Sequence, residues 1–331
     1  MRSPTLSELP PPPPGKTGWP WTEATPQAPD RMPDGSPWPR ISIVTPSYNQ
    51  GQFIEETIRS VLLQGYPDLE YIILDGGSSD ESVDVIKKYS QWLAQWESRK
   101  DKGQSDAINK GLMAATGDIV AWVNTDDYYF PGVFNKVASA YSASDKQGFW
   151  YLTAVDLIDE EDGHREILQQ RDFRTLAEFI PADSYIHSAG VFWSRDIFLK
   201  AGGFDVDSHH GFDKEYWMRL ISYGYSTKVD NALVSAAYRL HPASKTVSAS
   251  LYFRHDWAKI GLKYSEQAGL NRAGINEQKE LFVYSAIRLA QNTRYSFKKR
   301  FSYLSECLFL KPTVLVRRDW IGTLYRLCLG R

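Results

Sequence analysis

The chain of 331 residues lacks the features that mark several large classes of protein. It has only two cysteines, Cys307 and Cys328, with no Cys or His at metal-ligand spacing, which argues against a disulfide scaffold and a structural zinc module. No run of 18 apolar residues occurs, and no apolar stretch follows Met1. We therefore expect neither a membrane-spanning helix nor a secretory signal, and the cysteine usage fits a reducing cytoplasm.

Basic charge is not in excess either. The chain carries 38 Lys and Arg against 40 Asp and Glu, a net charge of -2, which argues against a general nucleic-acid binder. The glycine-rich GxGxxG and GxxxxGK[ST] motifs are missing, so a dinucleotide site and a P-loop are disfavoured. What the chain does have is 42% hydrophobic and 14% aromatic residues, which predicts a packed core and flat stacking surfaces.

Composition divides the chain into three regions. Residues 1–40 hold 12 of the 18 prolines and are predicted to form an extended arm, although Trp19, Trp21 and Trp38 favour packing of its second half on the body. Residues 246–331 have a helical pattern, and the part from 291 to 331 contains nine Lys or Arg and two acids, a local charge of +7. The middle region, 41–245, has strand and helix signals instead.

Alternating strands and helices fill the first half of that middle region. Apolar strands are predicted at 41–44, 70–74 and 118–123, and a helical pattern follows each of the first two. Such βα units predict a doubly wound, mostly parallel sheet flanked by helices, with ligands at the carboxyl ends of the strands. Beyond residue 148 we expect strands at 149–155, 189–194 and 227–238 and a helix at 213–223.

Acidic residues follow two of these strands, at the predicted ligand edge. Asp75 ends the second strand, and Asp126 and Asp127 follow the third. Carboxylates gathered there repel one another unless a cation offsets the charge, so the combination predicts Mg²⁺ or Mn²⁺ together with a phosphate group. For any single aspartate, a turn or helix cap is the preferred interpretation, and only the combination favours a cation site. Tyr48, after the first strand, offers an aromatic face to a nucleobase or a side chain to the core.

Five motifs in this order resemble the family 2 glycosyltransferases of the GT-A fold. They are Val44–Asn49, Leu74–Asp80, Asp101–Gly111, Ala115–Asp118 and Asn124–Asp127. The resemblance implies a GT-A domain over 41–245, with a nucleotide-binding half at 41–130 and an acceptor half at 131–245. The Pro-rich arm (1–40) and the helical, basic, amphipathic C-terminal region (246–331) lie outside it.

The resemblance also implies roles for individual donor-side residues. Asp75 corresponds to the acid that contacts the base, and Asp126-Asp127 to the DxD-type motif, with Asp127 as the metal ligand. Asp106 stands in a segment where many members have an arginine, so its role is open. The donor-binding set implied in this way is Thr45, Pro46, Tyr48, Asp75, Asp106 and Asp126.

The acceptor side follows from two further stretches. Asp213 corresponds to the general base, with Glu215 as the second choice, although both acids would also favour a helix N-terminus through the macrodipole. The segment 238–245 resembles the family's closing motif, in which His241 or Lys245 reaches the metal or the diphosphate. We take His241 as the second metal ligand.

These assignments imply metal-dependent, inverting transfer of a sugar from a nucleotide diphosphate donor, UDP being weakly favoured, to an acceptor hydroxyl in polysaccharide or glycoconjugate synthesis. One alternative is a non-catalytic nucleotide-sugar-binding scaffold in a membrane assembly. Another is a nucleotidyltransferase, which usually has a glycine-rich basic loop after the first strand, and Thr45–Asn49 is not such a loop.

The tail has two interpretations. Apolar residues recur at helical spacing beside basic ones, which is typical of interfacial helices. Residues 291–331 would then contact the inner face of an anionic membrane, where a lipid-linked acceptor is presented. The same stripe would also suit packing on the catalytic domain or on a second subunit. The stripe consists of Phe297, Phe301, Leu304, Leu308, Trp320, Ile321, Leu324 and Leu327.

Overall fold

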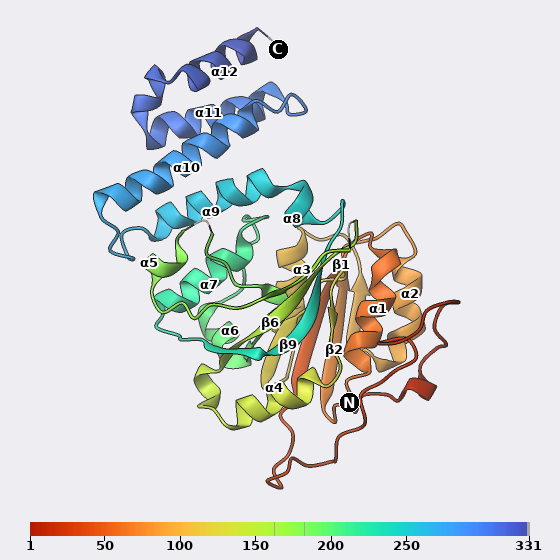
Figure 1. Cartoon of the computed structure of the whole chain (residues 1–331). Helices are drawn as coiled ribbons and strands as arrows, with labels where there is room; N and C mark the ends of the chain where they lie inside the picture. Colours follow the sequence, from red (N-terminus) through yellow and green to blue (C-terminus); the bar gives the residue numbers. More distant parts are fainter. Residues whose placement is uncertain (162, 182, 330–331) are drawn as a thin grey trace. The chain divides into compact units, whose positions relative to one another are not determined.

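The structure, a computed structural model, describes residues 1–161, 163–181 and 183–329 (Figure 1). The chain forms two compact units. The first contains Met1–Asp172, Ile186–His209 and Tyr223–His241, and the second contains Phe173–Tyr185, His210–Ser222 and the residues after His241. The proline-rich arm thus belongs to the first unit, and two segments from the middle of the sequence join the C-terminal helices.

A nine-stranded sheet is the centre of the first unit. Four parallel strands form one half, as the βα pattern predicts, with Ile41 of the first strand level with Leu69 and Ile119. The other half mixes parallel and antiparallel pairs. In spatial order the strands are β3 (Gln95–Ser98), β2 (Leu69–Asp75), β1 (Ile41–Ser47), β4 (Ile119–Trp122), β8 (Val191–Ser194), β6 (Trp150–Asp159), β9 (Lys228–Leu240) and β5 (Tyr128–Tyr129), while β7 (Arg165–Leu168) pairs with β6.

Helices cover this sheet closely. Every residue of β1 is buried, as expected of a strand covered on both faces. A Cβ atom on Gly111 would lie 2.4 Å from Cγ1 of Val44, so glycine is what lets its helix approach β1. The helices of this unit are α1 (Gly51–Leu62), α2 (Ser82–Tyr89), α3 (Gln104–Ala114), α4 (Val133–Ser142) and α6 (Arg195–Ala201), with 3₁₀ turns at Leu6–Glu8, Ser90–Trp92, Lys146–Gly148 and Ser188–Gly190.

The N-terminal arm packs on α1 through one buried arginine. Arg59 is fully buried, and its guanidinium donates to the carbonyls of Pro10, Pro20 and Trp21 at 2.8 to 3.0 Å. Trp21 itself is only 6% exposed. The packing expected from the tryptophans is therefore present, because the arm's unpaired carbonyls, left by its proline-rich sequence, find donors on α1.

Replacing Arg59 tests this account of the arm. We expect Arg59→Met to lower the free energy of unfolding by about 3 kcal/mol, since several buried carbonyls lose their donor together. Arg31→Met, an exposed change in the same arm, should cost less than about 0.5 kcal/mol. Urea unfolding of both variants measures the difference, and equal stabilities would mean that the arm contributes little to the fold.

The second unit is entirely helical in its described part. Its C-terminal helices share an apolar core that includes Phe282, Val283, Leu304 and Trp320. None of the helices within the described residues has the length and apolar character needed to cross a membrane. The elements are α5 (Leu176–Phe179), α7 (Phe212–Ser222), α8 (Lys245–Ser248), α9 (Ser250–Tyr264), α10 (Arg272–Ala290), α11 (Phe297–Leu310), a 3₁₀ turn (Pro312–Val316) and α12 (Arg318–Cys328).

Candidate active site

The loops that follow β1 and β2 are tied together by Asn49. Its φ of 50° lies in the left-handed region, which asparagine tolerates better than most residues. The Asn49 amide donates to Oγ of Ser78 at 2.8 Å, and its Oδ1 accepts from the amide of Ser79 at 2.8 Å. The two predicted ligand loops therefore form one connected edge.

Asp75 organises the second of these loops. The side chain is 2% exposed, and its carboxylate accepts from the amide and the hydroxyl of Ser78 at 2.9 and 2.5 Å and from the hydroxyl of Ser98 at 2.6 Å. The amide of Gly77 donates to it at 3.1 Å. These bonds fix the path of the loop, and the contact of Asp75 with a nucleobase stays a prediction.

The three residues predicted after β1 lie in different surroundings. Thr45 is fully buried, with its hydroxyl 3.0 Å from that of Tyr71, so its side chain faces the core. The carbonyl of Pro46 accepts from the hydroxyl of Thr125 at 2.6 Å. It so connects β1 to the loop that follows β4 and contains Asp126 and Asp127, which we call the acidic loop. Tyr48 is 63% exposed, which leaves its ring free to stack on a ligand.

A residue that the sequence reasoning did not single out lies beside Tyr48. A Cβ placed on Gly76 would approach the Tyr48 ring at 3.3 Å and the carboxylate of Asp101 at 3.2 Å. Asp101 also accepts from the amide of Gly103 at 2.8 Å. An aromatic ring, a bare backbone and a carboxylate thus meet at this edge, and the only signal for Asp101 in the sequence is its position at the start of the third motif.

A threonine of α1 fixes the backbone of the acidic loop. The hydroxyl of Thr57 lies 2.6 Å from the carbonyl of Thr125 and 2.7 Å from that of Asp127, and it donates to them. Thr57 is fully buried. Because these two carbonyls flank Asp126 in the chain, this one hydroxyl fixes the backbone on either side of that residue.

The two adjacent aspartates, Asp126 and Asp127, have different hydrogen-bond partners. Asp127 is 1% exposed, and its carboxylate accepts from the amide of Arg239 at 3.0 Å and from the side chain of Asn124 at 3.1 Å. Burial, and then the neighbouring Asp126, raise the pKa of Asp127 well above its usual value. Asp126 instead points to His241, with Oδ2 3.1 Å from Nε2. The pair Asp126 and His241 thus presents an oxygen and a nitrogen donor at one point.

Arg239 supplies positive charge next to these acids. Its guanidinium lies 2.8 Å from the carboxylate of Glu56 and is stacked between the rings of Phe53 and Tyr128, 5.2 and 4.8 Å from their centroids. The side chain is 7% exposed. Sequence reasoning gave Arg239 no role, although it lies in the closing motif two residues before His241.

Asp106 serves its own helix. It accepts from the amide of Lys102 at 3.1 Å and pairs with Lys110 at 2.8 Å, and this hydrogen bond with Lys110 is the main reason why the pKa of Asp106 is lowered. In α3 it is Gln104 that reaches the acidic loop, donating to Oδ1 of Asn124 at 2.7 Å. That Asp106 contacts the donor stays a prediction.

Asp213 and Glu215, both in the first turn of α7 in the second unit, differ in their contacts. Glu215 is 3% exposed and accepts from Arg219, Lys263 and Tyr264 at 2.7 to 2.9 Å. Burial raises the pKa of Glu215, but these hydrogen bonds outweigh it and the pKa is lowered. The Asp213 carboxylate accepts from the amide of Lys214 at 2.8 Å, and burial raises its pKa. Glu215 is therefore an anchor, whereas Asp213 has the raised proton affinity that suits a base.

Lys214 lies between these two acids in the chain and points into the second unit. Its ammonium donates to the carbonyls of Pro181 and Ser184, each at 2.8 Å, and lies 5.1 Å from the ring centroids of Phe179 and Trp257. Burial lowers the pKa of Lys214 to about 7. The lysine thus fastens the segment before residue 185 to α7 beside Asp213.

Other features of the structure bear on where a ligand would bind. No cluster of three or more His, Cys, Asp or Glu side chains suited to a metal ion occurs among the described residues. Lys245, the other residue predicted to reach the diphosphate, begins α8 in the second unit. A cavity of about 520 Å³ is lined by Lys136, Tyr151 and Lys228. It opens at the starts of β6 and β9, the opposite strand ends from the acidic loop, and is separate from the candidate site.

Comparison with known proteins gives a consistent result. The model of the family described as glycosyl transferase family 2 matches residues 42–199. An uncharacterized glycosyltransferase of a Nostoc species is 32% identical over 300 residues, covering 88% of each chain. This relative extends the similarity well beyond the segment that the family model matches.

Two solved structures have a similar fold. S. aureus TarS 1-349 in complex with UDP-GlcNAc is 16% identical, with a TM-score of 0.51, and the match covers 88% of this chain and 81% of that one. The mannosyltransferase PcManGT of Pyrobaculum calidifontis, in complex with GDP-Man and Mn²⁺, is 16% identical, with a TM-score of 0.52 and coverage of 91% and 90%. At this identity the likeness concerns the fold.

Proposed function

Because the chain belongs to glycosyl transferase family 2, we propose that it transfers a sugar, with inversion, from a nucleotide diphosphate sugar to an acceptor hydroxyl. The prediction of a glycosyltransferase with a GT-A fold is confirmed by the family match and the similar structures. The observation that carries the finer proposal is the pair of Asp126 and His241 at the edge where the parallel strands end. We place this reaction in polysaccharide or glycoconjugate synthesis.

The donor's nucleoside would lie against Tyr48, the backbone of Gly76 and Asp101. An exposed ring beside a glycine and a carboxylate suits a flat base and a hydroxylated ribose. Thr45, Pro46 and Asp75 then act by holding the loops of this surface in place. Of the similar structures one holds UDP-GlcNAc and the other GDP-Man, and we propose a UDP-sugar as the donor of this chain.

Asp126 and His241 would hold the divalent cation. Mg²⁺ and Mn²⁺ take carboxylate oxygens, Mn²⁺ also accepts imidazole, and such ions commonly use one or two protein ligands together with substrate phosphates. Asp127, the ligand expected from the sequence, has both oxygens in hydrogen bonds to Arg239 and Asn124, which favours Asp126 for this role. When bound, the ion stabilises the negative charge of the departing diphosphate. Asp127 supports the loop, and Arg239 offsets its charge.

Asp213 would be the general base. The acceptor oxygen forms a bond to the anomeric carbon while the bond from that carbon to the diphosphate oxygen breaks. The acceptor's proton passes to Asp213, and the diphosphate leaves with the electron pair. One displacement of this kind inverts the anomeric centre and needs no covalent sugar intermediate. The raised pKa of Asp213 supports this role, since a base with higher proton affinity is the better acceptor.

The alternative is a scaffold that binds a nucleotide sugar without turning it over. The raised pKa of the Asp213 carboxylate favours the enzyme, because a raised proton affinity is of use to a general base and not to a binding scaffold.

A thermal-shift screen of nucleotide sugars with Mn²⁺ tests the proposal. The correct donor at 100 times its dissociation constant should add about 2.7 kcal/mol to the apparent stability. Slow release of nucleoside diphosphate from that donor, with water as acceptor, should then separate an enzyme from a scaffold. A stabilising donor that stays intact would favour the scaffold, and the absence of any stabilising nucleotide sugar would contradict both.

A further inference from the structure

The outer face of α12 is apolar and basic. The inner face of this helix is buried: Trp320, Thr323 and Leu327 are 4%, 1% and 2% exposed. Of the other residues of the helix, Leu324 packs partly against the core, whereas Ile321 and Tyr325 are 47% and 66% exposed. We call this surface the outer face of α12, and it consists of Arg318, Ile321, Tyr325, Arg326 and Leu329.

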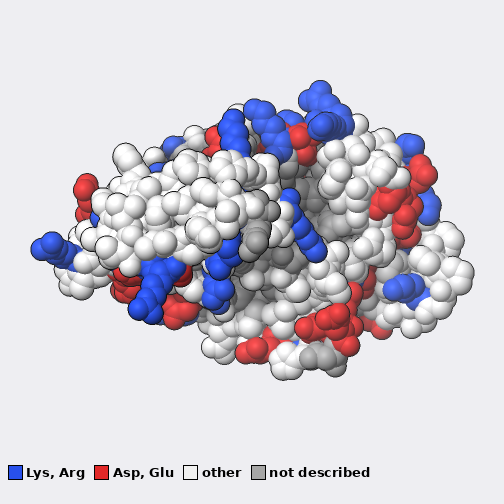
Figure 2. Space-filling model, turned by 90° about the horizontal axis from the view of Figure 1, so that it is seen from above, with Lys and Arg blue, Asp and Glu red and all other residues white. Residues whose placement is uncertain are grey.

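Two further residues of the helical unit are apolar and exposed. Phe309, near the end of α11, is 90% exposed, and Val316, in the turn that leads to α12, is 81% exposed. Figure 2 looks down on this side of the helices and shows a broad uncharged area with Lys and Arg side chains at its borders. Leaving large apolar side chains this exposed to water is unfavourable, so such a surface indicates a site where a partner binds.

The structure divides the apolar stripe of the tail between two roles. Leu304, Trp320 and Leu327 face the core of the helical unit itself, a packing that the sequence interpretations did not include. Phe297, Phe301 and Ile321 are 56%, 46% and 47% exposed. Packing thus accounts for the inner part of the stripe, including Leu308 and Leu324, whereas Phe297 and Phe301 stack on each other and stay about half exposed.

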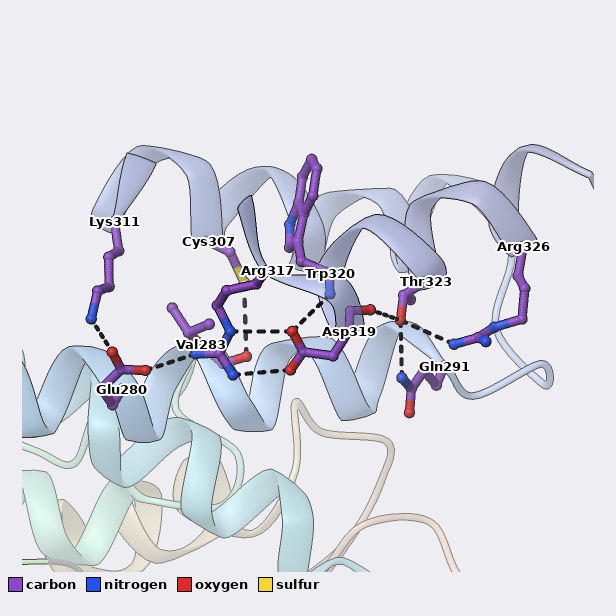
Figure 3. A network of polar contacts seen from close by, with 10 residues as sticks. All are labelled: Glu280, Val283, Gln291, Cys307, Lys311, Arg317, Asp319, Trp320, Thr323 and Arg326. Atoms are coloured by element: carbon purple, nitrogen blue, oxygen red, sulfur yellow. Dashed lines mark hydrogen bonds and ion pairs between the residues drawn. The ribbon is translucent and has the colours of Figure 1, made fainter. Parts of the chain in front are cut away.

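Two acids near α12, Glu280 and Asp319, are about half exposed and are paired with basic residues (Figure 3). Glu280 of α10 pairs with Lys311 and with Arg317, and Arg317 also pairs with Asp319, the one acid of α12. These ion pairs neutralise part of the charge of +7 that residues 291–331 carry. Arg318 and Arg326 remain, and no carboxylate of the described residues forms an ion pair with either; the guanidinium of Arg326 lies 3.4 Å from the hydroxyl of Thr323 (Figure 3).

We infer that the outer face of α12, together with Phe309 and Val316, docks on an anionic lipid bilayer. A bilayer surface offers what this face lacks: negative headgroups for the arginines and an apolar layer for the exposed rings and aliphatic chains. The cytoplasmic leaflet of a membrane carries such a negative charge. The inference is independent of the reaction proposed above, although a lipid-linked acceptor would be presented at the same surface.

Two other occupants fit less well. A second copy of the chain, bound through a two-fold axis, would set Arg318 and Arg326 against the same residues with no acid between them. A soluble polyanion would neutralise the arginines but leave Phe309 and Val316 in water. A partner whose surface is both anionic and apolar contacts the arginines and the exposed apolar side chains together.

Co-sedimentation of the full chain with vesicles tests the inference. We expect binding to phosphatidylglycerol–phosphatidylcholine vesicles at low salt, release at high salt, and little binding to phosphatidylcholine alone. The double variant Arg318→Gln/Arg326→Gln should bind about 30-fold more weakly, from the loss of two charges near the lipid surface. Phe309→Ser/Val316→Ser should also weaken binding at low salt. Because it removes no charge, it should leave the salt dependence of binding nearly unchanged.

A matched control carries the same loss of charge elsewhere. Lys88→Gln/Lys200→Gln removes two exposed lysines of the first unit and should leave vesicle binding unchanged. Equal weakening by this control would mean that only net charge matters, and the inference would fail. It would fail equally if the intact chain ignored anionic vesicles, or formed a dimer that the Phe309 and Val316 changes disrupt.

Discussion

Replacing Asp213 by asparagine should lower turnover at least about 100-fold while donor binding stays nearly intact, as expected for the loss of a general base. The change keeps the size of the side chain and its hydrogen bond with the amide of Lys214 but removes the ability to accept a proton. Steady-state kinetics give the turnover, and calorimetric titration of the nucleoside diphosphate gives the donor affinity.

Glu215→Gln is the matched control for this prediction. It makes the same carboxylate-to-amide change two residues away, but in a side chain whose oxygens are occupied by Arg219, Lys263 and Tyr264. We expect it to lower stability by about 1 to 3 kcal/mol and to leave most of the turnover. If Glu215→Gln abolished turnover and Asp213→Asn did not, the base would be Glu215.

The pH profile gives a second check of Asp213. Burial raises the pKa of this carboxyl, so the rate of the intact enzyme should fall at acidic pH as the base takes up a proton before it meets the acceptor. In Asp213→Asn this acidic limb should disappear from the residual rate. A limb that persists unchanged would belong to another group and would contradict the assignment.

Asp126→Asn should make UDP binding in the presence of Mn²⁺ at least about 100-fold weaker and insensitive to the metal, if this carboxylate is the metal's charged ligand. Without Mn²⁺ the variant and the intact chain should bind UDP alike. Titration calorimetry with and without the ion measures both. His241→Gln should reduce the metal dependence in the same direction, because it removes the nitrogen donor 3.1 Å from Asp126.

Asp127→Asn separates the two aspartates. Its NH2 group would face one of the two donors, the amide of Arg239 or the side chain of Asn124, so we expect a loss of stability while the metal dependence of UDP binding is kept. The opposite pattern, with metal dependence lost in Asp127→Asn and kept in Asp126→Asn, would return the ligand to the residue expected from the sequence. Equal affinity of the intact chain with and without Mn²⁺ would exclude the metal role for both.

Much of the fold follows from the sequence alone. The strands expected at 41–44 and 70–74 lie within β1 and β2, and the one expected at 118–123 contains β4. The loops that follow the first two lie together at one edge, joined through Asn49. These features are local: an apolar run of strand length and a turn that ends it depend on neighbouring residues. The helical character of the tail was predictable for the same reason, since periodicity is a property of one segment.

Only the tertiary structure decided what the individual side chains do. The sequence presents Asp126 and Asp127 as equals, but the amide of Arg239, from a distant strand, occupies Asp127 and leaves Asp126 to His241. In the tail, periodicity placed Trp320 and Ile321 in one stripe, and the packing of α12 buries the first and exposes the second. Local pattern determines an element and its amphipathic character, whereas the partner of each group comes from residues far away in the chain, which no spacing rule can identify.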